Sequence, residues 1–122
     1  MHNLKDGALL RQQCYIDGRW VGSDSGATIA VSNPATAEAI GSIPKMGAAE
    51  TRRAIAAANV ALPGWRSKTA AERGRLLRRW SGLMLEKQDD LALIMTSEQG
   101  KPLAEARGEI AYAASYLEWF AE

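Results

Sequence analysis

The first part of the chain alternates short apolar runs with turn residues, a pattern typical of β-strands. Two such runs within residues 13–21 flank Asp17 and Gly18. Asp-Gly is a favoured two-residue hairpin turn, because both of its positions adopt positive φ. We therefore expect a β-hairpin at residues 13–21, preceded by a flexible arm at residues 1–12.

Two further strands are expected before the chain becomes helical. Residues 28–31 and 39–43 carry the apolar residues of short strands. Pro34 lies in the turn between them, where its fixed φ and missing N–H are tolerated. All the strands are therefore expected within residues 13–43.

From residue 48 onward, apolar residues recur every three or four positions, which is the period of an α-helix. In the first helical stretch Ile55 and Leu62 share a face, and Pro63 is expected to end the helix. The pattern continues to residue 122 and predicts about four helices. The predicted fold class is an α+β segment, with short strands followed by helices.

Polar residues, glycine and proline mark where the later helices begin and end. Thr69 and Glu72 form a capping box, in which each side chain accepts the backbone N–H of the other residue. Asp89 is expected to cap the third helix, and Gly100 is expected to close it. Pro102 suits the first turn of the fourth helix.

The fourth helix is apolar around most of its circumference, so it is expected to be buried on several sides. It reaches Glu122 without a glycine, asparagine or proline that would end it. We interpret the sequence as a truncated one, whose missing part supplies the neighbours of this helix. The large apolar residues of this stretch are Ile110, Tyr112, Tyr116, Leu117, Trp119 and Phe120.

Composition supports the same interpretation. The sequence contains 22 alanines, but leucine, isoleucine, valine and phenylalanine together number only 23 of its 122 residues. Buried stabilisation follows apolar area, at roughly 25 cal/mol per Å², and alanine offers little area. The chain is therefore expected to need more partner surface than it brings.

Charge and cysteine content exclude several classes of protein. The net charge of +1 gives no field that favours nucleic acid or an anionic membrane. No apolar run is long enough to span a membrane, and residues 1–10 lack the apolar core of a secretory signal. Cys14, the only cysteine, cannot form an internal disulfide, which favours a cytoplasmic location.

Six segments, in order and from residue 15 to the end, resemble the N-terminal part of bacterial succinate-semialdehyde dehydrogenases, members of the aldehyde dehydrogenase superfamily. They cover essentially the whole chain but about a quarter of a full family member. The segments are residues 15–20 (YIDGRW), 31–36 (VSNPAT), 40–47 (IGSIPKMG), 57–65 (AANVALPGW), 95–106 (MTSEQGKPLAEA) and 109–122 (EIAYAASYLEWFAE).

The resemblance implies a larger α/β fold with a Rossmann-like cofactor domain, in an enzyme that forms dimers or tetramers. In such enzymes a cysteine thiolate attacks the aldehyde, hydride passes to NAD or NADP, and a glutamate activates water to release the acid. An asparagine holds the oxyanion. None of these residues has a match here, so we expect no catalytic, cofactor-binding or metal-binding residue. The chain would be an inactive scaffold by itself, and the choice between NAD and NADP stays open.

Tyr112, Tyr116 and Trp119 form an aromatic stripe at spacings of four and three residues. A stripe of this kind is most often part of a core. The resemblance implies a second interpretation, because in the family this helix borders the tunnel through which the aldehyde reaches the catalytic cysteine. A dry aromatic wall there would exclude water and orient the substrate. Phe120 is expected in the core.

Three other features invite a functional interpretation and are better explained by structure. Cys14 has no sequence neighbour that would activate a thiol. Lys101 follows Gly100 but lacks the remaining residues of a phosphate-binding loop, so the pair is interpreted as helix punctuation. A run of cations is interpreted as a solvated or inter-subunit face rather than a nucleic-acid surface. The run comprises Arg66, Lys68, Arg73, Arg75, Arg78 and Arg79.

Two functional hypotheses remain. In the first, the chain is a fragment of an NAD(P)-dependent semialdehyde dehydrogenase, with the rest of the enzyme, homologous subunits and a small aldehyde as partners. In the second, it is a non-catalytic helical interaction module that associates with full-length relatives. Neither hypothesis includes nucleic acid or a membrane.

Overall fold

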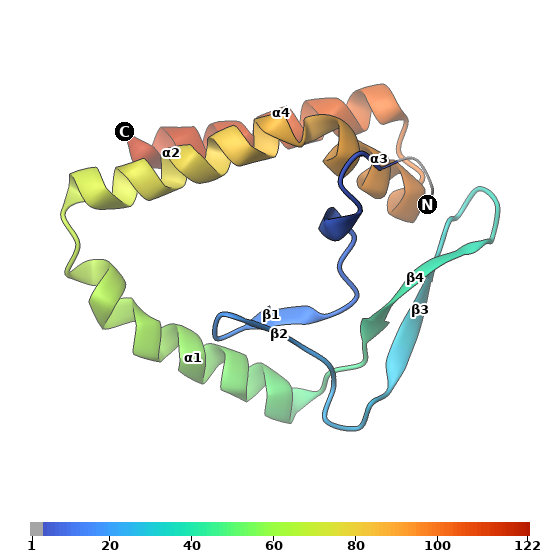
Figure 1. The fold of residues 1–122 in the computed structure, drawn as a ribbon, viewed down its shortest axis with the longest axis horizontal. Coiled ribbons are helices and arrows are strands. Elements are labelled where there is room, and N and C mark those ends of the chain that lie inside the picture. The colour runs from blue at the N-terminus through green and yellow to red at the C-terminus, as the bar shows by residue number, and fades with distance from the viewer. Residues whose placement is uncertain (1–3) are drawn as a thin grey trace.

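Two β-hairpins and then four α-helices follow one another along residues 4–122, the part of the chain that the computed structural model describes (Figure 1). The predicted fold class, strands followed by about four helices, is confirmed. A 3-10 turn, Gly7–Leu9, precedes the strands. The elements are β1 (Cys14–Ile16), β2 (Arg19–Val21), β3 (Thr28–Ser32), β4 (Ala39–Pro44), α1 (Ala48–Arg66), α2 (Ala70–Glu86), α3 (Gln88–Gln99) and α4 (Leu103–Ala121).

The strands form two separate antiparallel pairs, β1 with β2 and β3 with β4. The turn of the first pair is the one predicted, since Asp17 and Gly18 have φ values of 52° and 73°. Tyr15 pairs with Trp20 across this hairpin, and their rings are 5.2 Å apart. A two-stranded pair is marginally stable alone, so both hairpins depend on packing against other elements.

The segment before β1 is bound to the rest of the chain, which the sequence did not predict. The buried carboxylate of Asp90 accepts the backbone N–H groups of Lys5 and Asp6, at 3.0 and 2.8 Å. Residues 4–12, part of the expected flexible arm, are thereby joined to the beginning of α3. Residues 1–3 of that arm, with His2, lie outside the described residues.

Two of the predicted helix ends are wrong. Pro63 does not end α1, which continues to Arg66, because the proline removes only its own N–H donor and its carbonyl still accepts the N–H of Ser67, at 3.0 Å. Asp89 does not cap α3: Lys87 alone joins α2 to α3 and takes the capping position, leaving Asp89 in the first turn. The capping box of Thr69 and Glu72 is confirmed.

The joint between α3 and α4 is as expected, with one small difference. Gly100 closes α3 with φ 81°, in the left-handed region. Pro102 directly precedes α4 at its capping position and is not inside the first turn. Lys101, between them, pairs with Glu109 of α4. The interpretation of Gly100 and Lys101 as helix punctuation is confirmed.

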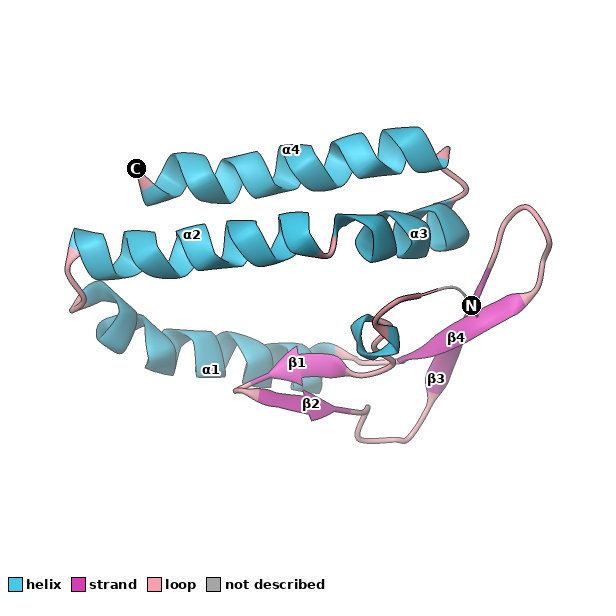
Figure 2. Ribbon diagram, turned by 45° about the horizontal axis from the view of Figure 1, so that its top comes forward, coloured by secondary structure: helices cyan, strands magenta, loops and turns pink. Residues whose placement is uncertain are grey.

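Helices α2 and α4 lie side by side and antiparallel, and small residues bring their backbones close together (Figure 2). A Cβ atom added at Gly74 would lie 2.6 Å from the carbonyl oxygen of Ala121. About two turns later, the buried hydroxyl of Ser81 donates to the carbonyl of Ala114 at 2.9 Å. The face of α4 that α2 and α3 cover contains Ala106, Ile110, Ala114, Leu117 and Ala121.

The core of the described chain is small. Its buried apolar residues are Ala92, Ala106, Ile110 and Ala114. The chain exposes 8700 Å², whereas a compact protein of its mass exposes about 6400 Å². Figure 1 shows α1 running apart from the α2–α4 pair, and Val60 of α1 is 82% exposed. Much of the chain's apolar surface is therefore uncovered, and the expectation that it needs partner surface stays a prediction.

Replacement of Gly74 by alanine is expected to destabilise the α2–α4 contact. The new methyl group would meet backbone at 2.6 Å, and overpacking of this kind costs about 1–3 kcal/mol. The matched control is Gly82→Ala, because nothing lies within 4 Å of a Cβ at Gly82. That variant is expected to gain up to about 1 kcal/mol of helix propensity.

The measurement is the free energy of unfolding of a soluble polypeptide that contains this segment. The expected order is Gly82→Ala most stable, then the parent, then Gly74→Ala. Equal stability of the two variants would show that α2 and α4 are not in close contact at Gly74.

Candidate functional site

The face of α4 opposite its packed face carries the three residues predicted from the aromatic stripe. Tyr112, Tyr116 and Trp119 lie on this open face, and all three are exposed in this chain. The spacing of four and three residues places them on one side of a helix, as expected. The structure therefore brings the three predicted residues together.

Tyr112 and Tyr116 form a hydrogen-bonded pair. Their hydroxyl oxygens are 2.7 Å apart, and their rings meet edge to face with centroids 5.0 Å apart. The hydrogen bond with Tyr116 raises the pKa of Tyr112, and partial burial and the charge of Glu109 act in the same direction. Tyr112 is therefore a neutral phenol at neutral pH, able to donate a proton in a hydrogen bond.

An open hollow of about 670 Å³ follows this face of α4 from Tyr112 to Glu122. Its volume lies within the range of small-molecule sites, roughly 300–1000 Å³. The residues that line it belong to α4, apart from Glu122, which directly follows this helix. A closed site would therefore need further walls from outside the described residues.

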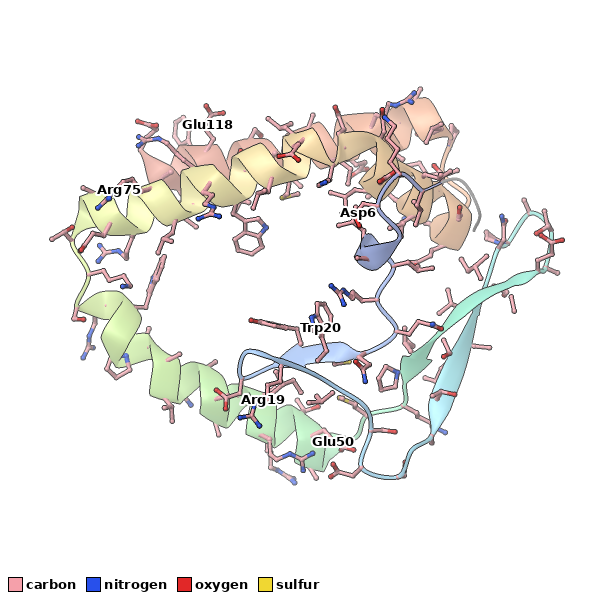
Figure 3. The ribbon with its side chains drawn as sticks, viewed as in Figure 1. Asp6, Arg19, Trp20, Glu50, Arg75 and Glu118 are labelled. Atoms are coloured by element: carbon pink, nitrogen blue, oxygen red, sulfur yellow. The ribbon has the colours of Figure 1, made fainter. Side chains whose placement is uncertain are left out.

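Phe120 is 72% exposed and also lines this hollow, so its expected place in the core is wrong for this chain. The reason is that α2 contacts the neighbouring Ala121 and leaves the side of Phe120 open. Glu118 and Glu122 line the hollow as well, and the sequence analysis did not single them out. Figure 3 shows Glu118 on the outer side of the α2–α4 pair.

Arg78, from the run of cations, fixes the end of α4. Its Nε and Nη2 donate to one carboxylate oxygen of Glu122, at 3.0 and 2.6 Å. Arg73 instead donates to the carbonyl of Lys68. These two arginines therefore have structural partners within the chain.

Cys14 lies half-buried in β1 as a free thiol, paired across the hairpin with Val21. Within residues 4–122, no group of three or more histidine, cysteine, aspartate and glutamate side chains could hold a metal ion. No helix in the same range is long and apolar enough to cross a membrane.

Comparison with known proteins identifies the family. A profile described as the aldehyde dehydrogenase family matches residues 20–122. The chain belongs to this family. The predicted resemblance is therefore confirmed.

Relatives within the aldehyde dehydrogenase family are similar over nearly the whole chain. Glutarate-semialdehyde dehydrogenase of Pseudomonas aeruginosa is 71% identical over 119 residues, which are 98% of this chain and 25% of that protein. The NADP-linked succinate-semialdehyde dehydrogenase of Escherichia coli is 61% identical, with the same two coverages. The chain thus spans the N-terminal quarter of these aldehyde dehydrogenases.

A solved aldehyde dehydrogenase has the same structure over this part. The crystal structure of succinate-semialdehyde dehydrogenase from Burkholderia pseudomallei matches with a TM-score of 0.95 and 63% identity, over 98% of this chain and 25% of that one. The described fold is therefore a segment of the aldehyde dehydrogenase fold, as predicted.

The family implies a dinucleotide cofactor. Within residues 4–122, the strand–turn–helix arrangement that resembles a phosphate site is β4 followed by α1. In that arrangement the helix N-terminus binds the anion. Here the buried carboxylate of Glu50 lies at that position and accepts the N–H groups of Gly47 and Asp24, at 3.0 and 3.1 Å. The residues at the beginning of α1 do not fit a dinucleotide phosphate.

Glu50 instead joins the loop before β3 to α1 in this aldehyde dehydrogenase segment. Its own backbone N–H and those of Asp24 and Gly47 hold the pKa of its carboxyl group below the ordinary value of 4.5. Arg53, nearby, binds both oxygens of Asp24, at 2.9 and 2.6 Å. Figure 3 shows Glu50 at this end of α1.

The pKa of Glu50 predicts a stability change in acid. Because the pKa is lower in the folded chain, the stabilisation is fully present above pH 4.5 and is lost as pH falls through the folded value. Glu50→Gln should therefore be less stable than the parent at pH 7, and the difference should shrink at pH 3. The measurement is the free energy of unfolding, at pH 7 and at pH 3, of a soluble polypeptide that contains the segment.

Glu86→Gln is the control for this comparison, because Glu86 is exposed at the end of α2. It should change stability little at either pH. A difference between Glu50→Gln and the parent that is the same at pH 7 and pH 3 would contradict the role given to the carboxylate.

Proposed function

We propose that these 122 residues form the opening part of an NAD(P)-dependent dehydrogenase that oxidises a semialdehyde to a dicarboxylic acid. The observation that carries the proposal is the 71% identity to a glutarate-semialdehyde dehydrogenase over 98% of the chain. A succinate-semialdehyde dehydrogenase at 61% identity supports the same substrate class. That class is a short aldehyde with a carboxylate at its other end.

The part played by this segment is that of a scaffold. The nucleophilic cysteine, the general-base glutamate and the oxyanion-binding asparagine of the family have no match here, so the segment supplies no reacting group. Residues 13–122 form the opening part of the enzyme's main body, and residues 1–12 form an N-terminal arm. The large exposed apolar surface, with Val60 82% and Trp119 77% exposed, supports burial by the remaining polypeptide and by other subunits.

Within that enzyme, the open face of α4 forms one wall of the aldehyde tunnel. Tyr112, Tyr116 and Trp119 supply the aromatic surface, and the hollow along α4 supports this assignment because its volume suits a small ligand. The cofactor is NAD or NADP, and the E. coli relative carries NADP in its name. The free thiol of Cys14 agrees with a cytoplasmic enzyme.

A chimera tests the proposal. Residues 1–122 of this chain are joined to the remaining three quarters of the P. aeruginosa relative, which is 71% identical in the exchanged part. We expect the chimera to reduce NAD(P) with glutarate or succinate semialdehyde, within about tenfold of the relative's own rate. The 122-residue chain alone, and the relative without its N-terminal quarter, are both expected to be inactive.

The same experiment separates the two hypotheses. A folded but inactive chimera would overturn the dehydrogenase proposal. The interaction-module alternative instead expects the 122-residue chain to bind the intact relative in trans, which a pull-down with purified proteins measures. We expect no such binding, because in the intact relative its own N-terminal quarter already occupies the position.

A further inference from the structure

Residues 4–12, here called the strap, run from the beginning of α3 to β1 (Figure 1). Asp90, in the first turn of α3, is only 5% exposed. Each of its carboxylate oxygens accepts one backbone N–H of the strap, from Lys5 at 3.0 Å and from Asp6 at 2.8 Å. Hydrogen bonds to a charged group are stronger than those between neutral groups. The strap is therefore fixed to α3 through its backbone.

The strap meets the helices at the joint between α2 and α3. Lys87 alone separates the two helices, and its φ of −100° and ψ of 14° depart from the helical values of about −63° and −42°. A kink or break in a helical run usually has a local cause, such as a proline or a glycine. Residues 83–99 contain neither. The break at Lys87 therefore has another cause.

The residues at the joint do not explain the break by their own preferences. Glu86, Lys87 and Gln88 are all good helix formers, which favour a helix that continues from α2 into α3. Asp89 and Asp90 favour the first turn of a helix, but both side chains are bonded to other parts of the chain and neither caps α3. Contacts with other segments therefore hold the break.

Asp6 of the strap connects the two sides of the break. Its backbone N–H binds Asp90 on α3, and one of its carboxylate oxygens lies 3.6 Å from Nζ of Lys87, in the break itself. Figure 3 shows Asp6 next to α3. Helix α4 contributes one further bond, from the side chain of Gln88 to the carbonyl of Arg107, at 2.9 Å. The strap thus contacts both the break and the helix that follows it.

We propose that the strap is a conformational lock for the joint between α2 and α3. Bound to Asp90, it holds the break, and its release allows α2 and α3 to join into one helix. The direction of α3 matters because Ala92 is fully buried in a cluster with Ala106 and Ile110 of α4. The lock thereby determines where α3 packs on α4. The inference goes beyond the proposed function, since it involves neither substrate nor cofactor.

Hydrogen exchange of the chimera described above, followed by mass spectrometry, tests the lock. Asp90→Asn keeps the size of the side chain but offers one accepting oxygen in place of two. Exchange over residues 4–12 and over residues 84–92 is expected to become about tenfold faster or more, because a hydrogen bond to a charged group is lost. Residues 50–62 of α1 are the internal reference and should exchange as in the parent.

Asp89→Asn is the matched control, because it makes the same change at the neighbouring residue. The carboxylate of Asp89 is exposed and binds the side chains of Lys5 and Arg107, not the backbone of the strap. Exposed ion pairs contribute little to stability, so exchange should change less than about threefold.

A chimera that begins at residue 10 separates the strap from any direct effect of Asp90 on α3. It retains Asp90 and lacks most of the strap, and it should show the same faster exchange over residues 84–92. Addition of Asp90→Asn to this shortened chain should cause no further change, since two changes that remove one contact are not additive.

Unchanged exchange over residues 84–92 in the shortened chain would overturn the inference, because the strap would then not hold the joint. Equal acceleration over all three ranges would also overturn it, since the strap would then support the whole fold and not the joint. Exchange is measured without substrate, so these outcomes are separate from the activity that tests the proposed function.

Discussion

The contact between α2 and α4 holds the helical part of this chain together, and it is made by residues that bury little area. Gly74 allows the carbonyl of Ala121 to approach, and Ser81 bonds to the carbonyl of Ala114. Small residues bring helices close, but apolar area determines how much burial stabilises a fold. The α2–α4 contact therefore fixes the positions of the two helices closely but contributes little hydrophobic stabilisation. The chain carries its large apolar residues elsewhere, on α1, on the outer side of α2 and on the open face of α4.

The separation of small and large side chains onto opposite faces explains how α4 can serve both structure and function. The small residues of α4 face α2, while Tyr112, Tyr116 and Trp119 face the opposite side. A rigid helix fixed on one side can position side chains on its other side more accurately than a loop can. Figure 3 shows Trp20 on the β1–β2 hairpin, on the side turned toward α2 and α4, where it adds to the apolar surface left uncovered. In the proposed enzyme, these surfaces receive the polypeptide that carries the reacting groups.

The sequence predicts those features that depend on local chemistry. The Asp17-Gly18 turn, the capping box at Thr69 and the left-handed Gly100 all follow from the backbone preferences of single residues. The stripe of Tyr112, Tyr116 and Trp119 follows from helical spacing alone. Two errors are local, since Pro63 does not end α1 and Lys87 takes the capping position expected of Asp89. The error at Phe120 concerns a distant contact, because its exposure depends on where α2 packs. Arg78 with Glu122, and Asp90 with the segment before β1, have no local signal in the sequence.

The central claim is that the apolar surface of these 122 residues is completed by polypeptide outside them. Sedimentation and thermal unfolding of the isolated 122-residue chain, with an apolar dye present, test it most directly. We expect self-association, dye binding and a broad unfolding transition, because exposed apolar surface of this extent promotes association. A monodisperse monomer that binds no dye and unfolds in one sharp transition would contradict the account.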